Sequence, residues 1–501
     1  MNFNLLDEGF IPVLWSDGRV GRVGIRTALA EAGRIRQIAA SNPMDNVALL
    51  RFLLAVLYWC KGPPPAPDEK DKIIATGQFP PSWFTKLDQQ EKKNCLNLLG
   101  DGKRFYQYRN SPGAQGKTLT ANYLVHDVPT GTNAWHFRHS TDGNDGLCLG
   151  CCAMGLVRLP LFSTSGGSGK PPGINAKPPI YVSPFGKTLL ETLQLNWVPA
   201  GDPGTPAWEA PDMRLPTSGT VPLLAGLSWL PRRVWIDDPS LPAGTCIACG
   251  RQEGALVRTC VFAGVASAKL SDDAPARDWR DPHVVYAKDK DGVLLSAHAS
   301  NALGSPDAAS NQWAKFLRDL LAEGAAPLAV RHAAALANSA SSAISVSVVG
   351  FSSVQNDKYL EAWERRLVIP SNMLLIQASV PAAAHMEQWT QEAKKCLAKA
   401  RPHKAKSSAR MPAELAPAFS AIRPHVESRV SANVTDLLTQ PELAWPQAVD
   451  EYRRMMPVIA QSLAPGFTTR ALQRRNQIAS ALPDMTAKPA PKPKPKKGGD
   501  I

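Results

Sequence analysis

The sequence has no long hydrophobic run and no segment that resembles an export signal. Residues 1–8 show no basic region followed by an apolar stretch, so we expect a cytoplasmic protein without a signal peptide. The most apolar segment, Val47 to Cys60, contains Arg51 and is too short to cross a bilayer. We expect it to form a buried core helix, with Asn42 as its N-cap and Pro43 at its first position, and we expect no membrane partner.

Recognisable catalytic motifs are also missing. There is no His-Glu-x-x-His sequence, and the glycine-rich segment 165–170 is not a phosphate-binding P-loop. That motif needs a glycine where Thr164 stands and a serine or threonine where Pro171 stands. We therefore expect no enzymatic activity. The main alternative to a non-catalytic role is a zinc-dependent enzyme that processes nucleic acid. A scaffold that binds only protein is the second alternative.

Acidic residues are in short supply. The chain has 501 residues, with 56 Lys and Arg against 43 Asp and Glu, a net charge of +13 and a pI of about 9.3. The tail at 485–501 contributes +4 of this charge, which leaves +9 for the rest of the chain. Such an excess favours a polyanionic partner, of which nucleic acid is the common one, although a solubility surplus is the alternative.

Cysteine is sparse, and its nine copies are an odd number. Without an export signal, a disulfide framework is not expected. Four cysteines stand alone and are predicted to be packing residues, namely Cys60, Cys95, Cys260 and Cys396.

Four further cysteines form two Cys-x-x-Cys pairs, Cys148/Cys151 and Cys246/Cys249. A tight turn of this kind, helped by Gly150 and Gly250, points two sulfurs at one ion, and two such turns supply a tetrahedral structural Zn²⁺ site. Because 94 residues separate Cys151 from Cys246, the metal would clip two remote segments together. Two independent redox or packing pairs are the alternative. Cys152 is adjacent and is expected to point elsewhere.

The pattern along the chain predicts an α+β protein with a large mixed α/β domain at 1–377. We expect a hairpin over 10–25, a helix at 26–33, a proline-rich connector at 62–72 and irregular structure over 131–179. Residues 344–369 read as a hairpin whose return, from Tyr359, is a strand or a helix by pattern alone.

The C-terminal part is predicted to be helical. Apolar residues recur every three or four positions from Leu415 to Leu437, and similar patterns occur near 382–400, 449–456 and 468–482. We expect a four-helix bundle over 378–484. The tail at 485–501 alternates lysine with proline and is predicted to be disordered.

An ordered set of segments resembles a known family. The set comprises LLDEGFIPV at 5–13, RFYQ at 104–107, GTN at 131–133, the first cysteine pair, the glycine-rich segment, the second cysteine pair, WRDPH at 279–283, a hairpin with Gln355 at its tip and a helical C-terminal domain. This order is similar to that of CasA, the large subunit of the type I-E Cascade complex of CRISPR immunity. The resemblance covers nearly the whole chain.

The resemblance implies a non-catalytic subunit that lies by the 5′ handle of the guide RNA. It would read the short protospacer-adjacent motif (PAM) on double-stranded DNA, start duplex opening and recruit the helicase–nuclease. The implied partners are the guide RNA, PAM-containing DNA, the other Cascade subunits and that effector. Protein reading of a short duplex motif, with base pairing reading the remainder, is the usual division of labour in RNA-guided recognition.

Residue roles follow from the resemblance position by position. The implied DNA-reading residues are Gly166, Gly167 and Gly169 in the glycine-rich loop, Lys269 in the minor groove, and Val354, Gln355 and Asn356 at the wedge. The implied guide-RNA anchor is Asn133, Trp135, His136, Phe137, Arg138 and His139. A basic run suited to phosphates comprises Lys394, Lys395, Lys399, Arg401, Lys404 and Lys406. Without the resemblance, the glycine-rich segment would be interpreted as a flexible loop, Gln355 as the polar tip of a hairpin and the basic run as a solvated face.

Overall fold

The structure, a computed structural model, describes residues 2–100, 102–107, 116–125, 146–163, 173–175, 179–210, 219–264, 277–288, 294–296, 326–337, 343–354 and 358–370, with a few positions between 461 and 476. The chain divides into two compact units. The first comprises Met1–Ala299, Pro327–Ala337 and Ile344–Arg366, and the second Ser300–Ala326, Asn338–Ala343 and Leu367–Ile501. The predicted boundary at 377/378, the bundle at 378–484 and the tail lie outside the described residues, apart from those few positions.

The apolar segment noted in the sequence forms helix α2, Pro43–Cys60. Asn42 caps it, with its side-chain oxygen accepting a hydrogen bond from the Met44 amide at 2.9 Å, and Pro43 takes the first position as expected. Among the described residues, α2 is the one helix long and apolar enough to span a membrane, but 83% of its most apolar window is buried inside the protein. The prediction that this segment is too short to span was wrong, because the helix begins before Val47. Its burial identifies it as a core helix.

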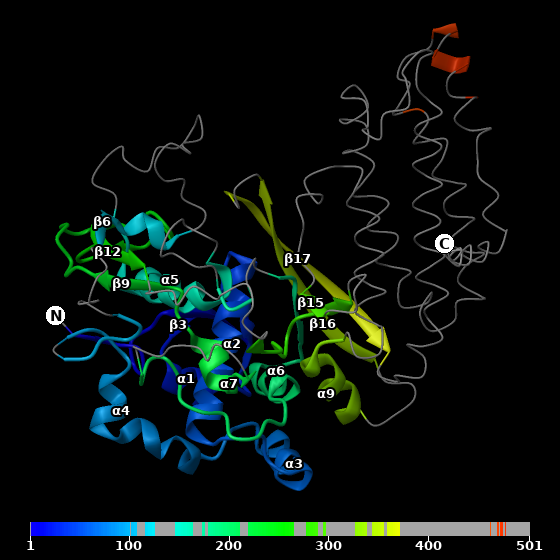
Figure 1. Cartoon of the computed structure of the whole chain (residues 1–501), viewed down its shortest axis with the longest axis horizontal. Helices are drawn as coiled ribbons and strands as arrows, with labels where there is room; N and C mark the ends of the chain where they lie inside the picture. Colours follow the sequence, from blue (N-terminus) through cyan, green and yellow to red (C-terminus); the bar gives the residue numbers. More distant parts are fainter. Residues whose placement is uncertain are drawn as a thin grey trace, which may run out of the picture. The chain divides into compact units, whose positions relative to one another are not determined.

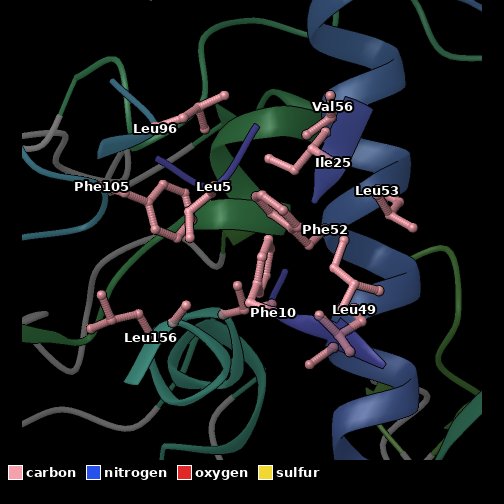
Figure 2. Close-up of a cluster of buried hydrophobic side chains, with 14 of the residues drawn as sticks. Leu5, Phe10, Ile25, Leu49, Phe52, Leu53, Val56, Leu96, Phe105 and Leu156 are labelled. Carbon is pink, nitrogen blue, oxygen red and sulfur yellow. The ribbon is translucent and has the colours of Figure 1, made fainter. Parts of the chain in front are cut away.

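The main hydrophobic core forms around α2. Figure 2 shows Phe52 pointing from this helix toward Phe10 and Phe105, which come from segments far apart in the sequence. The ring centroid of Phe52 lies 6.2 Å from that of Phe10 and 5.4 Å from that of Phe105, both edge to face. Such aromatic pairs add stability beyond the apolar area they bury. Leu156, from helix α5 (Leu149–Phe162), closes another side of this core.

The predicted N-terminal hairpin is confirmed as part of a small antiparallel sheet. Its strands are β2 (Ile11–Trp15) and β3 (Val20–Val23), joined by a turn in which Gly18 has φ 89°. Strand β4 (Ile35–Ile38) pairs with the other edge of β2, so the order is β3-β2-β4. Helix α1 (Ile25–Ala30) follows the hairpin, close to the predicted 26–33. Nearby, β1 (Phe3–Asn4) pairs with β5 (Asn97–Leu99).

A second sheet has the order β6-β12-β9. Its strands are β6 (Lys117–Thr120), β12 (Thr259–Gly264) and β9 (Arg232–Ile236), all antiparallel to their neighbours. Three further sheets in the described part of the chain have two short strands each. They are β10 (Gly244–Thr245) with β11 (Gln252–Glu253), β8 (Gly219–Thr220) with β13 (Arg277–Asp278), and β14 (Tyr286–Lys288) with β15 (Leu294–Ser296).

The third sheet contains the long hairpin predicted over 344–369 (Figure 1). Its strands are β16 (Ala343–Val354) and β17 (Lys358–Pro370), so the return is a strand rather than a helix. Strand β7 (Tyr181–Pro184) pairs with the other edge of β16, antiparallel, with Val349 opposite Tyr181. The hairpin is therefore held to the body of the protein along one edge near its base.

The remaining helices that the structure describes were not predicted from the sequence patterns. The elements are α3 (Pro67–Thr76), η1 (Pro81–Asp88), α4 (Gln90–Asn94), η2 (Ala121–Leu124), α5, α6 (Leu189–Asn196), α7 (Leu223–Ser228) and α9 (Leu328–Leu336). The connector predicted at 62–72 is wrong in its second half, because Pro67 starts α3 at a position that proline favours. The irregular stretch predicted at 131–179 contains α5, whose small residues hid its helical pattern.

A buried ion pair joins α5 to α2. Arg158 donates to both carboxylate oxygens of Asp45 at 2.5 and 2.8 Å and to the Leu124 carbonyl at 3.0 Å. Both side chains are almost fully buried. Loss of one partner of such a pair typically costs about 3–5 kcal/mol because the other charge is left buried and unpaired. The pair therefore sets how α5, which carries the first cysteine pair, lies against the core.

Candidate metal centre

The first cysteine pair lies at the start of α5. Cys148 is the N-cap residue, and its sulfur accepts a hydrogen bond from the Cys151 amide at 3.4 Å. The predicted tight turn is thus the first turn of a helix. Its free amides and dipole favour negative charge, and so favour thiolates. Gly150 was expected to help the turn. Its lack of a side chain instead leaves room for Arg22, since a Cβ at position 150 would lie 3.1 Å from Nη1 of that arginine.

The second pair lies in the turn between β10 and β11. The Cys246 amide donates to the Arg251 carbonyl, and the Gly250 amide donates to the Cys246 carbonyl, both at 2.8 Å. Gly250 has φ 71°, a conformation that glycine adopts without strain. Here the predicted tight turn, and the part that glycine plays in it, are confirmed.

Backbone pairing brings the two remote pairs together. Gly146 forms a parallel bridge with Cys246, and Leu147 forms an antiparallel bridge with Val257. Leu147 and Val257 exchange amide-to-carbonyl hydrogen bonds at 3.0 and 2.8 Å. The Cys148 amide also donates to the sulfur of Cys246 at 3.3 Å. The segments that carry the pairs are therefore joined directly, independently of any bound ion.

The four sulfurs form one cluster. Those of Cys148, Cys151, Cys246 and Cys249 all lie within 4.8 Å of one another, and those of Cys148 and Cys249 are 3.8 Å apart. Zinc–sulfur bonds of about 2.3 Å in a tetrahedron place neighbouring sulfurs about 3.8 Å apart. The donor set and its spacing fit one four-coordinate metal ion. The alternative of two independent pairs is wrong.

A cation accompanies the cluster. Arg22, on β3, donates from Nη1 to the sulfur of Cys148 at 3.6 Å and from Nη2 to that of Cys151 at 3.7 Å. Burial opposes its charge, but the neighbouring sulfurs of Cys151 and Cys148 outweigh this effect and raise the pKa of Arg22 above the ordinary arginine value. Hydrogen bonds from the Cys148 and Cys151 thiols lower the pKa of Cys246 to about 3, whereas hydrogen bonds among the same sulfurs raise the pKa of Cys151. The surroundings thus favour the thiolate form of Cys246, the form that binds metals.

The other cysteines that the structure describes take no part in the cluster. Cys152 is fully buried beside Cys151, and burial raises the pKa of its thiol well above the usual value. Cys95 and Cys260 are buried and Cys60 is half-buried, as expected of packing residues. Cys396 lies outside the described residues.

Most of the other predicted site residues also lie outside the described residues. These are Asn133, Trp135, His136, Phe137, Arg138, His139, Gly166, Gly167, Gly169, Lys269, Gln355, Asn356, Lys394, Lys395, Lys399, Arg401, Lys404 and Lys406. Val354 is the last residue of β16, and its backbone alone is described. Their roles stay predictions.

Sequence reasoning missed Arg22, whose side chain reaches the cluster. An arginine on a short strand that follows a turn looks like a solvent-exposed residue. The alternation of β3 offers no signal either, since Val20 is exposed and Val23 is buried. Its place beside Cys148 and Cys151 depends on the packing of the start of α5 against the N-terminal segment, where a Cβ at Gly150 would lie 3.4 Å from the Gly9 carbonyl oxygen.

The chain is similar to CRISPR-associated proteins in sequence and in fold. Residues 4–463 match the family model described as CRISPR-associated protein Cse1. A relative from Thermus thermophilus, described as CRISPR-associated protein CasA/Cse1, is 32% identical over 229 residues, which is 42% of this chain and 43% of that protein. The aligned region thus spans less than half the length of that relative.

Two solved structures share the fold. The crystal structure of CasA from Thermus thermophilus has a TM-score of 0.68 at 22% identity and covers 96% of this chain and 100% of that one. A chain of a CRISPR RNA-guided surveillance complex has a TM-score of 0.69 at 15% identity and covers 97% and 100%. The mixed α/β fold predicted for the first part of the chain is therefore confirmed, and the chain belongs to the CRISPR-associated Cse1 family, also called CasA.

Proposed function

We propose that this protein is the non-catalytic large subunit of a type I-E Cascade complex, which reads the PAM on double-stranded DNA, starts duplex opening and recruits the helicase–nuclease. The observation that carries the proposal is the match of residues 4–463 to the Cse1 family. The similarity to a chain of an RNA-guided surveillance complex, over the whole of that chain, supports it. The net charge of +13 suits nucleic-acid partners.

The proposed DNA-reading residues come from three segments. They are Gly166, Gly167 and Gly169, then Lys269, then Val354, Gln355 and Asn356. Glycine permits close approach of the backbone to the minor groove. A lysine donor suits the acceptors at adenine N3 and thymine O2, which are shared between A·T and T·A pairs. Because that code is degenerate, we expect several PAM sequences to be accepted.

The flat amide of Gln355 would act as a wedge beside the PAM, a place where proteins usually insert apolar side chains. The segment from Asn133 to His139 would contact the guide-RNA handle, since its arginine and aromatic residues suit stacking and phosphate contact. The run from Lys394 to Lys406 would bind phosphates of the displaced strand.

We also propose that the ion held by the four cysteines is structural Zn²⁺. A catalytic zinc keeps an open position for water, whereas four sulfur ligands fill a tetrahedral shell. Cys148 follows the proposed RNA-anchoring segment, and Val257 leads into β12, which ends before the segment that carries Lys269. The ion would hold these two segments together without touching nucleic acid. This arrangement speaks against the alternative of a zinc-dependent enzyme.

Replacing Arg22 by glutamine is expected to weaken zinc binding by about 10- to 100-fold, the usual effect of changing a residue that contacts metal ligands. Glutamine can still donate one hydrogen bond to sulfur but cannot offset the negative charge of four thiolates. Chelator competition on the purified chain measures the affinity. Arg22→Lys keeps the charge, so its zinc affinity should lie between those of wild type and Arg22→Gln. Equal zinc affinity in Arg22→Gln and wild type would show that Arg22 does not support the site.

Gln355→Ala and Lys269→Ala are each expected to slow strand opening on PAM-bearing DNA while complex assembly stays intact. Fluorescence of 2-aminopurine placed beside the PAM reports opening, and gel filtration with guide RNA and the other subunits reports assembly. Neutralising the run from Lys394 to Lys406 provides the comparison. It should weaken binding to all sequences alike and reduce its salt dependence. Opening at the wild-type rate in both single variants would refute the proposed roles.

A further inference from the structure

The described residues that flank the glycine-rich segment at 165–170 are fastened to each other. Ser163, two residues before the segment, accepts a hydrogen bond at its carbonyl from the Gly173 amide at 3.0 Å. A Cβ at Gly173 would lie 2.8 Å from the Pro160 carbonyl oxygen, so the close approach requires glycine. The base of the segment that carries Gly166, Gly167 and Gly169 is thus set by backbone contacts with the end of α5.

Asn175, two residues beyond Gly173, links this base to a second segment. Its Oδ1 accepts a hydrogen bond from Nε1 of Trp279, and its Nδ2 donates to Oδ2 of Asp281, both at 2.9 Å. An indole N–H can only donate and a carboxylate can only accept, so the amide satisfies both in one orientation alone. Trp279 directly follows β13, at the end of the segment that carries Lys269. One side chain therefore joins the ends of two proposed DNA-reading segments.

The partners of Asn175 are themselves anchored in the core. The carboxylate of Asp281 also receives both Nη groups of Arg51, at 2.5 and 2.7 Å, and the His283 amide at 3.0 Å, with Arg51 and Asp281 fully buried. Arg51 lies in the middle of α2. The ring of Trp279 packs so closely on α7 that a Cβ at Gly226 would lie within 2.6 Å of three ring atoms. Asn175 thus bridges two groups that have little freedom to move.

The WRDPH segment at 279–283 also contacts the support of the third proposed DNA-reading segment, the one that carries Gln355. The carbonyl of His283 accepts a hydrogen bond from the Val182 amide at 2.7 Å. Val182 lies in β7, opposite Val348 of β16, and β16 ends at Val354, the residue before Gln355. The WRDPH segment at 279–283 is consequently in contact with the supports of all three proposed DNA-reading segments.

We propose that Asn175 is a positioning residue for PAM recognition, which fixes the base of the glycine-rich segment relative to the base of the segment that carries Lys269. This inference rests on the proposed function and deepens it. Asn175 acts through Trp279 and Asp281 and touches no DNA. Without its amide, the carboxylate loses one of four hydrogen bonds and the indole N–H loses its acceptor, so the two bases are free to shift relative to each other.

The test compares PAM preference, the ratio of affinities for duplexes with and without a PAM, in complexes reconstituted with each variant. Asn175→Ala should lower it about tenfold, the effect expected when a hydrogen bond to a charged group is lost. Trp279→Phe removes only the hydrogen bond to Oδ1 of Asn175 and keeps both the ring on Gly226 and the bond from Asn175 to Asp281, so it should lower PAM preference in the same direction but by less. The matched control is Asn4→Ala. Asn4 also bridges two groups, with its Nδ2 donating to the Lys93 carbonyl at 3.0 Å and its Oδ1 accepting from the Leu6 amide at 2.9 Å, but neither partner supports a proposed DNA-reading segment.

Positioning also predicts coupling with Lys269. Lys269→Ala should reduce PAM preference much less in the Asn175→Ala background than in wild type, because a displaced lysine already contributes little to that preference. Unchanged preference in Asn175→Ala, an equal loss in Asn4→Ala, or fully additive effects of Asn175→Ala and Lys269→Ala would overturn the inference. If the wild-type complex shows no PAM preference, the proposed function itself fails.

Discussion

Replacing Cys246 by serine is expected to reduce zinc from one ion per chain to none and to destabilise the protein strongly. The sulfur of Cys246 lies in the four-sulfur cluster and also accepts the Cys148 amide at 3.3 Å. A serine hydroxyl is a poor substitute for a thiolate, and three remaining sulfurs leave a tetrahedral shell open. Binding to a structural zinc site is folding free energy, so we expect a loss on the order of several kcal/mol.

Metal analysis of the purified chain and thermal unfolding measure the two effects. Cys152→Ala is the matched control, since Cys152 is adjacent to a ligand and fully buried but lies outside the cluster. It should keep one zinc per chain and lose only some packing energy. A Cys246→Ser protein that retains full zinc would contradict the assignment, and so would a Cys152→Ala protein that loses it.

The four-cysteine cluster could be predicted from the sequence because two Cys-x-x-Cys pairs are a specific signal for a shared metal site. The separation of 94 residues between Cys151 and Cys246 obscured how the pairs meet. Their meeting depends on the Gly146–Cys246 and Leu147–Val257 bridges, which no local pattern encodes. Arg22 was missed for the same reason. Contacts between distant parts of a chain are set by the packing of the whole fold.

Secondary structure was predictable where apolar periodicity or capping is strong. Helix α2 has both signals, and the hairpin of β2 and β3 has two apolar runs around a glycine turn. Helix α5 was missed because glycine and cysteine near its start resemble a loop. In the folded protein its Gly155 is a close-contact position, since a Cβ there would lie 2.7 Å from the Cβ of Leu124.

The buried ion pairs show a further limit of sequence patterns. Arg51 is conspicuous in an apolar segment, but its partner Asp281 is 230 residues away. The WRDPH segment was noticed as part of a resemblance, without a physical reason for its residues. In the structure, Asp281 and Trp279 bind the amide of Asn175. The segment thus supplies two supports for Asn175, the buried Asp281 and the half-buried Trp279.

Omitting this chain from an otherwise complete guide-loaded complex is expected to abolish PAM preference. In the proposed division of labour, the other subunits hold the guide RNA and base pairing reads the target, so only this chain distinguishes one flanking sequence from another. Good base-specific contacts each contribute about 1–3 kcal/mol. A complex without the chain should therefore lose a discrimination of about tenfold or more.

The measurement is selection of bound duplexes from a library that has a fixed target and randomised flanking bases, with and without this chain. The account predicts that the complete complex enriches a small set of related flanking sequences, consistent with minor-groove reading. The complex that lacks the chain should bind all flanks alike. Equal enrichment in both complexes, or no enrichment in either, would contradict the claim that this protein reads the PAM.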